Sequence, residues 1–188
     1  MVKIYVDADA CPVKKEIERI AIRHNLETFL VCDGGIRPSM NPLIKNIFVN
    51  QGADAADDWI VDNIEPANIC VTNDIPLAGR CLKRGAFVIK PNGNIYDTNN
   101  IGMALAIRKI MEEKREKGEI TRGPDPFNKA DRSKFLNQME MIGIIVDMET
   151  PEESVANRTT YDVVWADGTD GFEIYDCELM ALDDVPEW

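Results

Sequence analysis

Carboxylate side chains are the groups of this chain whose positions best suit chemistry. Asp7 and Asp9 follow the apolar run at residues 2–6, and Asp74 follows the apolar run at residues 69–72. Short apolar runs rich in β-branched residues predict buried strands. In an open α/β sheet, ligands bind beyond the carboxyl ends of the strands. The sequence therefore predicts an acidic site at that edge of the sheet.

Three further aspartates, Asp54, Asp57 and Asp58, stand at i, i+3 and i+4 where a helix is predicted to begin. Side chains at this spacing share one face of a helix. Each negative charge near a helix N-terminus stabilises the helix by roughly 0.3 to 1 kcal/mol. One or two of these three aspartates can therefore have a purely structural role. Asp74 has a similar alternative as an N-cap. A third carboxylate on one face repels the others, so we expect at least one to bind a cation or to be catalytic.

These six aspartates are expected to converge at one edge of the sheet, in a chain with a single histidine. That residue, His24, closes the apolar stripe of the helix predicted after Pro12, and we expect it to pack at the helix end. Carboxylates without imidazole ligands favour Mg²⁺ or Mn²⁺ over zinc. Such ions activate a water molecule and neutralise the charge that develops on a phosphate group, as nucleases require.

The elements that must position these acids alternate along residues 1–140. Strand and helix patterns follow one another in units of about 25 to 35 residues, which is typical of a three-layer α/β/α sandwich with a mainly parallel sheet. The predicted strands are residues 2–6, 28–32, 44–49, 69–72, 86–89 and 95–96. The predicted helices begin near residues 12, 54, 74 and 100, and a last short helix spans residues 131–141.

The remaining residues, 141–188, have a different composition and pattern. They hold thirteen acidic residues and one basic residue, Arg158, whereas residues 1–140 hold 20 of each sign. Four short alternating runs predict strands at residues 143–148, 160–166, 171–175 and 178–182. The pattern resembles a small SH3-like barrel. We therefore predict a second domain at 141–188 that docks a protein partner, self-associates, shields a basic surface or keeps the protein in solution.

Composition excludes several other classes of function. Five cysteines, an odd number without a C-x-x-C pair, are interpreted as free thiols. No apolar run approaches the roughly 18 residues that a membrane span needs, and no signal peptide precedes the first strand. A cytoplasmic protein without a membrane partner is expected. No glycine-rich phosphate loop follows a strand, so a metal ion is the only cofactor expected.

Four motifs carry a resemblance to a known family. They are D-A-D-A-C-P-V at 7–13, G-A-D-A-A-D at 52–57, T-N-D-I-P-L-A at 72–78, and G-P followed by D-R-x-x-F within 123–135. Together they resemble the YaiI/YqxD family, also called UPF0178 or DUF188, over about residues 1–140. The resemblance implies a PIN-like nuclease fold and, by analogy with PIN and related nucleases, a Mg²⁺ or Mn²⁺ site.

The resemblance also implies roles for individual aspartates. Asp7, Asp57 and Asp74 match three acidic positions, Asp9 and Asp54 are supporting ligands, and Asp58 falls where relatives need not carry an acid. The metal ligands expected on this basis are Asp7, Asp9, Asp54, Asp57 and Asp74. The catalytic residues expected are Asp7, Asp9, Asp57 and Asp74.

The first functional hypothesis is a metal-dependent phosphodiesterase acting on RNA or on structured DNA. The residues expected to contact substrate are Arg37, Lys45, Asn73, Arg122 and Arg132. Because residues 1–140 are neutral overall and lack a strong basic patch, tight nonspecific binding of nucleic acid is not expected.

Two alternatives remain open from the sequence. The acids could bind a structural or regulatory ion in a non-catalytic module that docks a partner through its C-terminal domain. The D-x-D at the first strand end also matches phosphatases of the haloacid dehalogenase type, with Asp7 as nucleophile and Asp9 as general acid. Those enzymes usually carry Thr or Val where this chain has Cys11, and no separate catalytic Lys or paired-Asp motif follows at the expected distance.

Overall fold

The computed structural model describes residues 2–9, 11–35, 37–49, 52, 54–117, 126–149, 160–164 and 170–175. The chain divides into two compact units, Met1–Glu149 and Thr150–Trp188, which are described separately. None of the helices in the described ranges is both long and apolar enough to cross a membrane.

One six-stranded sheet organises the first unit, in the order β3-β2-β1-β4-β5-β6. Its strands are β1 (Lys3–Asp7), β2 (Glu27–Cys32), β3 (Ile44–Phe48), β4 (Ile69–Val71), β5 (Phe87–Ile89) and β6 (Ile95–Tyr96). Every neighbouring pair is parallel except β5 and β6, which are antiparallel. The predicted mainly parallel sheet is confirmed, and β1 lies inside it between β2 and β4.

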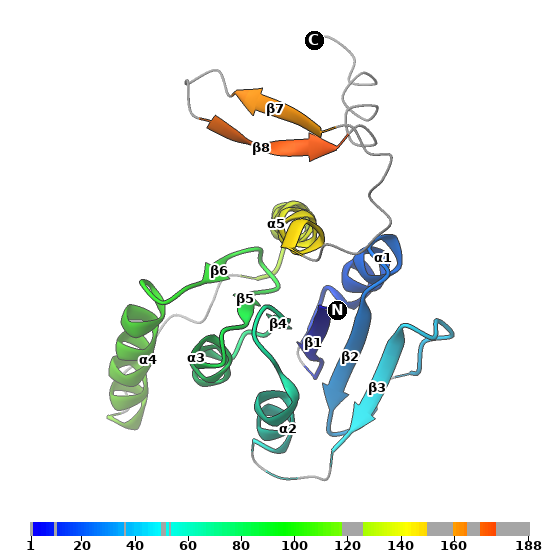
Figure 1. The fold of residues 1–188 in the computed structure, drawn as a ribbon. Coiled ribbons are helices and arrows are strands. Elements are labelled where there is room, and N and C mark those ends of the chain that lie inside the picture. The colour runs from blue at the N-terminus through cyan, green and yellow to red at the C-terminus, as the bar shows by residue number, and fades with distance from the viewer. Residues whose placement is uncertain are drawn as a thin grey trace. The chain divides into compact units, whose positions relative to one another are not determined.

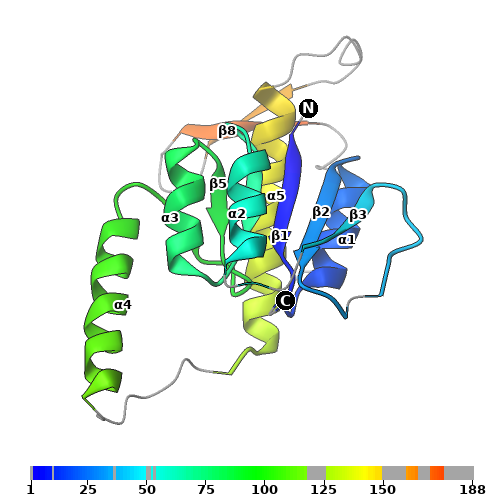
Figure 2. The same cartoon turned by 90° about the horizontal axis from the view of Figure 1, so that it is seen from below.

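Helices cover both faces of this sheet (Figures 1 and 2). They are α1 (Lys14–Arg23), α2 (Ala55–Asn63), α3 (Ile75–Lys83), α4 (Ile101–Glu116) and α5 (Lys129–Glu149). One core cluster joins α1 and α5 to the face that carries Ile4 and Val6. A second cluster joins α2 and α3 to the opposite face, which carries Tyr5. Because side chains alternate along a strand, β1 contributes to both cores, and the predicted three-layer class is confirmed.

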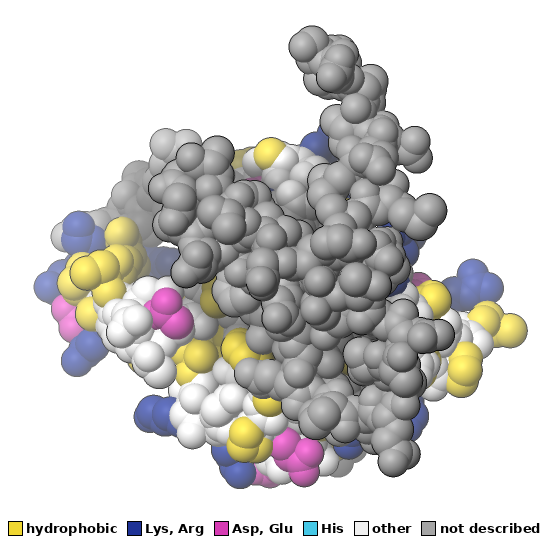
Figure 3. Space-filling view, turned by 45° about the horizontal axis from the view of Figure 1, so that its top comes forward, with side chains coloured by type: hydrophobic (Ala, Val, Ile, Leu, Met, Phe, Trp, Pro, Cys, Tyr) yellow, Lys and Arg dark blue, Asp and Glu magenta, His cyan; other side chains and the backbone are white. Residues whose placement is uncertain are grey.

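The fourth helix packs outside α3 rather than on the sheet. Gly79 of α3 faces this helix, and a Cβ there would lie 3.6 Å, an ordinary van der Waals distance, from side-chain atoms of Ile101 and Leu105. The rest of α4 exposes large apolar side chains, among them Met103 and Ile107. Figure 3 shows hydrophobic side chains between lysines and arginines at the left, where α4 lies.

The last helix is longer than the sequence predicts. The expected short helix at 131–141 and strand at 143–148 are replaced by the single helix α5, which also crosses the predicted domain boundary after residue 140. Phe135, Met139 and Ile142, at helical spacing, are all buried and fix the helix on the sheet. Extending a formed helix costs little even through β-branched residues, which lower helix propensity by less than about 1 kcal/mol each.

The second unit contains one antiparallel pair, β7 (Thr160–Val164) and β8 (Asp170–Tyr175), with a register irregularity between Asp162 and Val164. The predicted strands at 160–166 and 171–175 are confirmed in type. The strand predicted at 178–182 lies outside the described residues. The SH3-like barrel, and the partner docking expected of it, stay predictions.

The turn between β5 and β6 gives a first testable prediction. Gly93 has a φ of 78°, and a Cβ there would lie 2.7 Å from backbone atoms of Lys134 and Phe135 in α5. We expect Gly93→Ala to lower the free energy of unfolding by about 2 kcal/mol, through strain and the displaced helix. Urea unfolding measures this. Gly102→Ala, in open space on α4, is the control, and a Gly93→Ala variant as stable as that control would contradict the packing.

Candidate functional site

Asp7 lies at the carboxyl end of β1, half-buried, and is held there by a neighbouring strand. The Thr72 hydroxyl donates to Asp7 Oδ2 at 3.0 Å and accepts the Asp74 N–H at 2.9 Å. Thr72 is itself buried directly after β4. It therefore connects the first predicted acid to the start of α3. The sequence analysis did not single out this threonine, although it begins the T-N-D-I-P-L-A motif.

Asp74 has partners for both of its carboxylate oxygens. Its Oδ1 accepts the Leu77 N–H at 2.8 Å, so the residue is the N-cap of α3, as one reading of the sequence predicted. Its Oδ2 accepts from Arg108 Nη1 of α4 at 2.9 Å. Arg108 lies 34 residues away in the sequence, and nothing near it indicated this ion pair.

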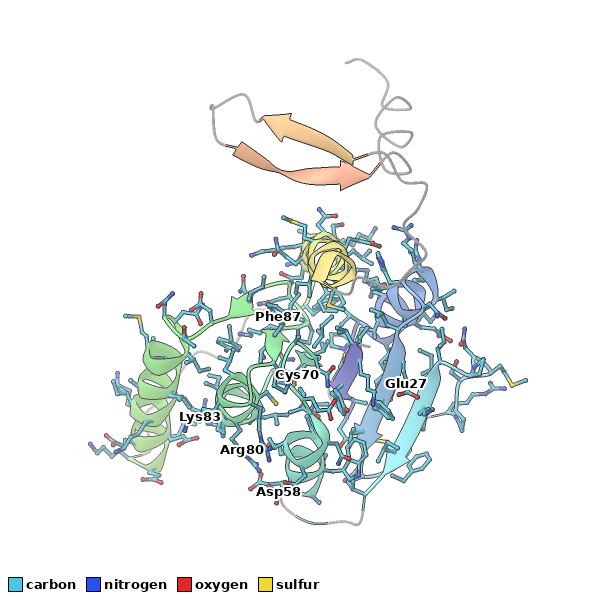
Figure 4. The ribbon with its side chains drawn as sticks, in the orientation of Figure 1. Glu27, Asp58, Cys70, Arg80, Lys83 and Phe87 are labelled. Atoms are coloured by element: carbon cyan, nitrogen blue, oxygen red, sulfur yellow. The ribbon has the colours of Figure 1, made fainter. Side chains whose placement is uncertain are left out.

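Asp54 and Asp58, at the start of α2, differ in their contacts. Asp54 is the residue before the helix, with a φ of 63°, and its side chain makes no cap hydrogen bond. Asp58 is 62% exposed and forms an ion pair with Arg80 of α3 at 2.6 Å. Figure 4 shows Asp58 and Arg80 side by side at the ends of α2 and α3. Asp58, the member of the trio whose role the family resemblance left open, is thus neutralised by a neighbouring helix.

The pKa of Asp57 is raised by burial and by the charges of the other acids. Burial raises its pKa to about 6, with further contributions from the negative charges of Asp74, Asp7 and Asp54 and an opposing effect of Arg80. The pKa of Asp7 is raised mainly by burial, against the hydrogen bond from Thr72, and also by Asp9 and Asp74. Acids from β1, α2 and the β4–α3 junction therefore interact at one edge of the sheet, where the sequence predicted them.

Asp9 lies further out and is exposed. Its Oδ2 accepts the Asp33 N–H at 3.3 Å, which ties the turn after β1 to the loop after β2. This contact places a second carboxylate near Asp7 without burying it. Asp9 can therefore move more freely than Asp7 toward a bound ion or water.

Oxygen donors of the right kind are present, but they are spread out. Within the described part of the chain, no three Asp, Glu, His or Cys side chains stand close enough to hold a metal ion together. Like charges without a counter-ion repel one another, and Asp74 is drawn toward Arg108. The donor set fits Mg²⁺ or Mn²⁺, but binding requires side chains to rotate toward one another.

The predicted substrate-contacting residues are dispersed. Asn73 is exposed at the acidic edge, between Thr72 and Asp74. Lys45 pairs with Glu27 near the opposite end of the sheet and lies over the Phe29 ring. Arg37 lines a cavity beside α1, and Arg122 lies outside the described residues.

Arg132 has a structural partner. It forms an ion pair at 3.1 Å with Glu16, a carboxylate of α1 that is only 6% exposed. A buried charge needs such a counter-ion. This arginine therefore joins α5 to α1.

His24 also joins α5 to α1. It is the C-cap residue of α1, and its Nε2 lies 2.8 Å from Glu140 Oε2 of α5. The expectation that this histidine packs at a helix end is confirmed. The acidic edge therefore lacks imidazole.

The raised pKa of Asp57 predicts a pH-dependent effect on stability. Protonated Asp57 favours the folded state below about pH 4, and this contribution is lost as the pH rises through about 6. Without metal at pH 8, Asp57→Asn is expected to raise the free energy of unfolding by about 1 kcal/mol, after allowing for solvent screening. Urea unfolding in EDTA at pH 4 and pH 8 measures this.

The stabilising effect of Asp57→Asn should vanish at pH 4, where the parent carboxyl is protonated. Asp62→Asn, an exposed change on the same helix, is the control and should stay within about 0.5 kcal/mol of the parent at both pH values. An equal effect of Asp57→Asn at both pH values would show that charge repulsion at the acidic edge is not its cause.

Comparison with known proteins gives one consistent match. The family described as "Uncharacterized BCR, YaiI/YqxD family" matches residues 5–143. A UPF0178 protein of Rhodopseudomonas palustris is 51% identical over 140 residues, covering 74% of this chain and 89% of the relative. A UPF0178 protein of Bradyrhizobium diazoefficiens is 50% identical over 138 residues, covering 73% and 83%. No solved structure matches the chain.

Proposed function

The chain belongs to the YaiI/YqxD family, and from this premise we propose that it is a metal-dependent phosphodiesterase that cleaves RNA or structured DNA. The observation that carries the proposal is the arrangement of Asp7, Asp57 and Asp74 at one edge of the sheet, with the Asp7 carboxylate joined to the backbone of Asp74 through the Thr72 hydroxyl. The same surroundings raise the pKa of Asp57 to about 6. Perturbed pKa values cluster at functional sites. An edge that gathers uncompensated negative charge in this way is suited to a cation.

Each acid has a task in this proposal. Asp7, Asp57 and Asp74 hold the ion, and Asp9 and Asp54 hold it or orient the attacking water. Thr72 fixes the Asp7 carboxylate by its hydrogen bond. Mg²⁺ or Mn²⁺ at this edge supplies positive charge against the phosphate and activation of a water nucleophile.

The charge balance explains why a cation is essential to the proposal. Carboxylates without a counter-ion repel the phosphates of a nucleic acid at short range. Arg80 and Arg108 flank the acids, but each is already engaged in an ion pair. Among the described residues, neither Asp7 nor Asp57 has an ion pair with a cation. In this proposal a divalent ion is what makes a polyanionic substrate acceptable.

A second candidate is supported by the contacts of Asp74. Both of its oxygens have protein partners, and the described acids are not assembled as a metal cage. A module that binds an ion weakly or not at all, and has no catalytic activity, would have this arrangement. The two candidates differ in one observable property, metal-dependent cleavage.

The test is cleavage of end-labelled RNA, single-stranded DNA and flap DNA with Mn²⁺, with Mg²⁺ and with EDTA. The double variant Asp7→Asn/Asp57→Asn, purified in the same way, gives the background from contaminating nucleases. We expect the parent to cut at least one substrate with Mn²⁺ and none with EDTA. Cleavage by the parent that never exceeds the background on any substrate would favour the non-catalytic candidate.

A further inference from the structure

Arg108 of α4 binds the oxygen of Asp74 that the start of α3 does not use. Asp74 Oδ1 accepts the Leu77 N–H at 2.8 Å and thereby caps α3. Arg108 Nη1 donates to the other oxygen, Asp74 Oδ2, at 2.9 Å. A metal ion that binds Asp74 without disrupting the helix cap must therefore bind Oδ2, which is the atom that Arg108 already contacts.

Binding of Arg108 and binding of a divalent ion to Asp74 Oδ2 oppose each other. Mg²⁺ lies about 2.1 Å from a ligating oxygen. An ion on Oδ2 would therefore stand no more than about 5 Å from Arg108 Nη1. Like charges at that distance repel, and the repulsion is twice as large for a divalent ion as for a monovalent one. Arg108 must therefore release Asp74 before the ion can bind there.

Arg108 has a second partner that remains when it releases Asp74. Its Nε donates to Glu112 Oε1 at 2.9 Å, one turn further along α4. The side chains of Arg108 and Glu112 are 38% and 49% exposed, so the guanidinium can turn in solvent and stay paired with Glu112. Every residue of α4 is described by the structure and none of them is buried, since this helix packs beside α3 (Figures 1 and 2). The release therefore leaves the core unchanged.

The other arginine at the acidic edge contacts a different acid. Arg80 of α3 pairs at 2.6 Å with Asp58, which is not among the expected metal ligands. Its charge nonetheless reaches Asp57, where it opposes the rise in pKa that burial causes. Arg80 therefore adds positive charge to the edge without occupying an oxygen of an expected ligand, whereas Arg108 occupies one.

We propose that Arg108 competes with a divalent cation for Asp74 Oδ2 and thereby lowers the metal affinity of the candidate site. This inference rests on the proposed function and adds a control of metal affinity to it. In the metal-free protein Arg108 neutralises Asp74, while Thr72 holds the Asp7 carboxylate. The cation displaces Arg108, which stays on α4 beside Glu112.

The test is titration of the full chain with Mn²⁺, followed by electron paramagnetic resonance of the free ion, which needs no cleavage. Arg108→Gln removes the competing charge and is expected to tighten Mn²⁺ binding about three- to tenfold. Arg80→Gln is the charge-matched control and should tighten binding by less than about twofold, because solvent and salt screen its charge. Damage to the fold would weaken binding, so it cannot produce a gain of affinity.

Glu112→Gln is expected to change the affinity in the opposite direction. It removes the second partner of Arg108, so Arg108 stays with Asp74 and Mn²⁺ binding should weaken about two- to threefold. In the Arg108→Gln background the same substitution should have little effect, because the arginine through which it acts is absent. A similar loss of affinity in both backgrounds would overturn the inference.

The titration separates failure of this inference from failure of the proposed function. Equal Mn²⁺ affinity of Arg108→Gln and the parent would overturn the inference and leave the proposed metal site intact. Equal tightening by Arg108→Gln and Arg80→Gln would also overturn it, because general charge would then be the cause. Tighter binding by Arg108→Gln alone, with no cleavage by any variant, would support the inference and refute the proposed nuclease. Absence of binding by the parent and every variant would overturn both.

Discussion

Asp7→Asn is expected to lower the rate of metal-dependent phosphodiester cleavage by about 10³-fold, equivalent to about 4 kcal/mol of transition-state stabilisation. An amide of the same shape keeps the Thr72 hydrogen bond but removes the negative charge from the most central strand-end acid. Single-turnover rates with Mn²⁺ and saturating protein measure the chemical step without the binding step.

Asp58→Asn is the matched control for that result. Asp58 stands next to Asp57 on the same helix, but it is paired with Arg80 and largely exposed. Its loss should change the cleavage rate by no more than about threefold, because exposed ion pairs contribute little. Similar rates for Asp7→Asn and the parent, or similar losses for both variants, would show that Asp7 has no special role.

The largest effect on stability is expected from Phe135→Ala. Phe135 of α5 is 0% exposed and belongs to the core that joins α5 and α1 to the sheet. Removing a buried phenyl ring costs about 3 to 5 kcal/mol through lost burial and the cavity that remains. Urea unfolding with a constant m value measures the loss.

Phe127→Ala provides the comparison for this core substitution. Phe127 precedes α5, is 36% exposed and contacts Arg132 through its ring. The expected loss there is below about 1 kcal/mol. If Phe135→Ala were no more destabilising than Phe127→Ala, α5 would not be held on the sheet by its buried stripe.

Local patterns were enough to predict the main elements. Each strand of the sheet coincides with an apolar run of the sequence. Pro76 and Asp74 indicated where α3 begins. Asp7 could be placed at a strand end because the apolar run at residues 2–6 stops directly before it. Because parallel strands share one carboxyl edge, the gathering of Asp7, Asp57 and Asp74 could also be predicted without coordinates.

Contacts between distant residues could not be predicted in this way. Arg108 binds Asp74 across 34 residues, and Arg80 binds Asp58 across 22. Neither pair has a fixed spacing that a sequence pattern could reveal. The sequence indicated which acids gather, but not which of them the protein neutralises itself.

The length of α5 and the position of Arg37 show two further limits of local reasoning. Ile144, Ile145 and Val146 favour a strand by propensity, but the helix begun at Lys129 continues through them. Lys14 and Lys15 are typical of a solvated helix face. Only the loop that returns from β2 to β3 places Arg37 opposite them.

Binding of Mn²⁺, followed by electron paramagnetic resonance of the free ion, tests the central claim most directly, because it needs no substrate. The account predicts saturable binding to the parent and to Asp58→Asn, and its loss in Asp7→Asn and in Asp57→Asn. Absence of saturable binding to the parent, or undiminished binding to Asp7→Asn, would contradict a carboxylate metal site at this edge of the sheet.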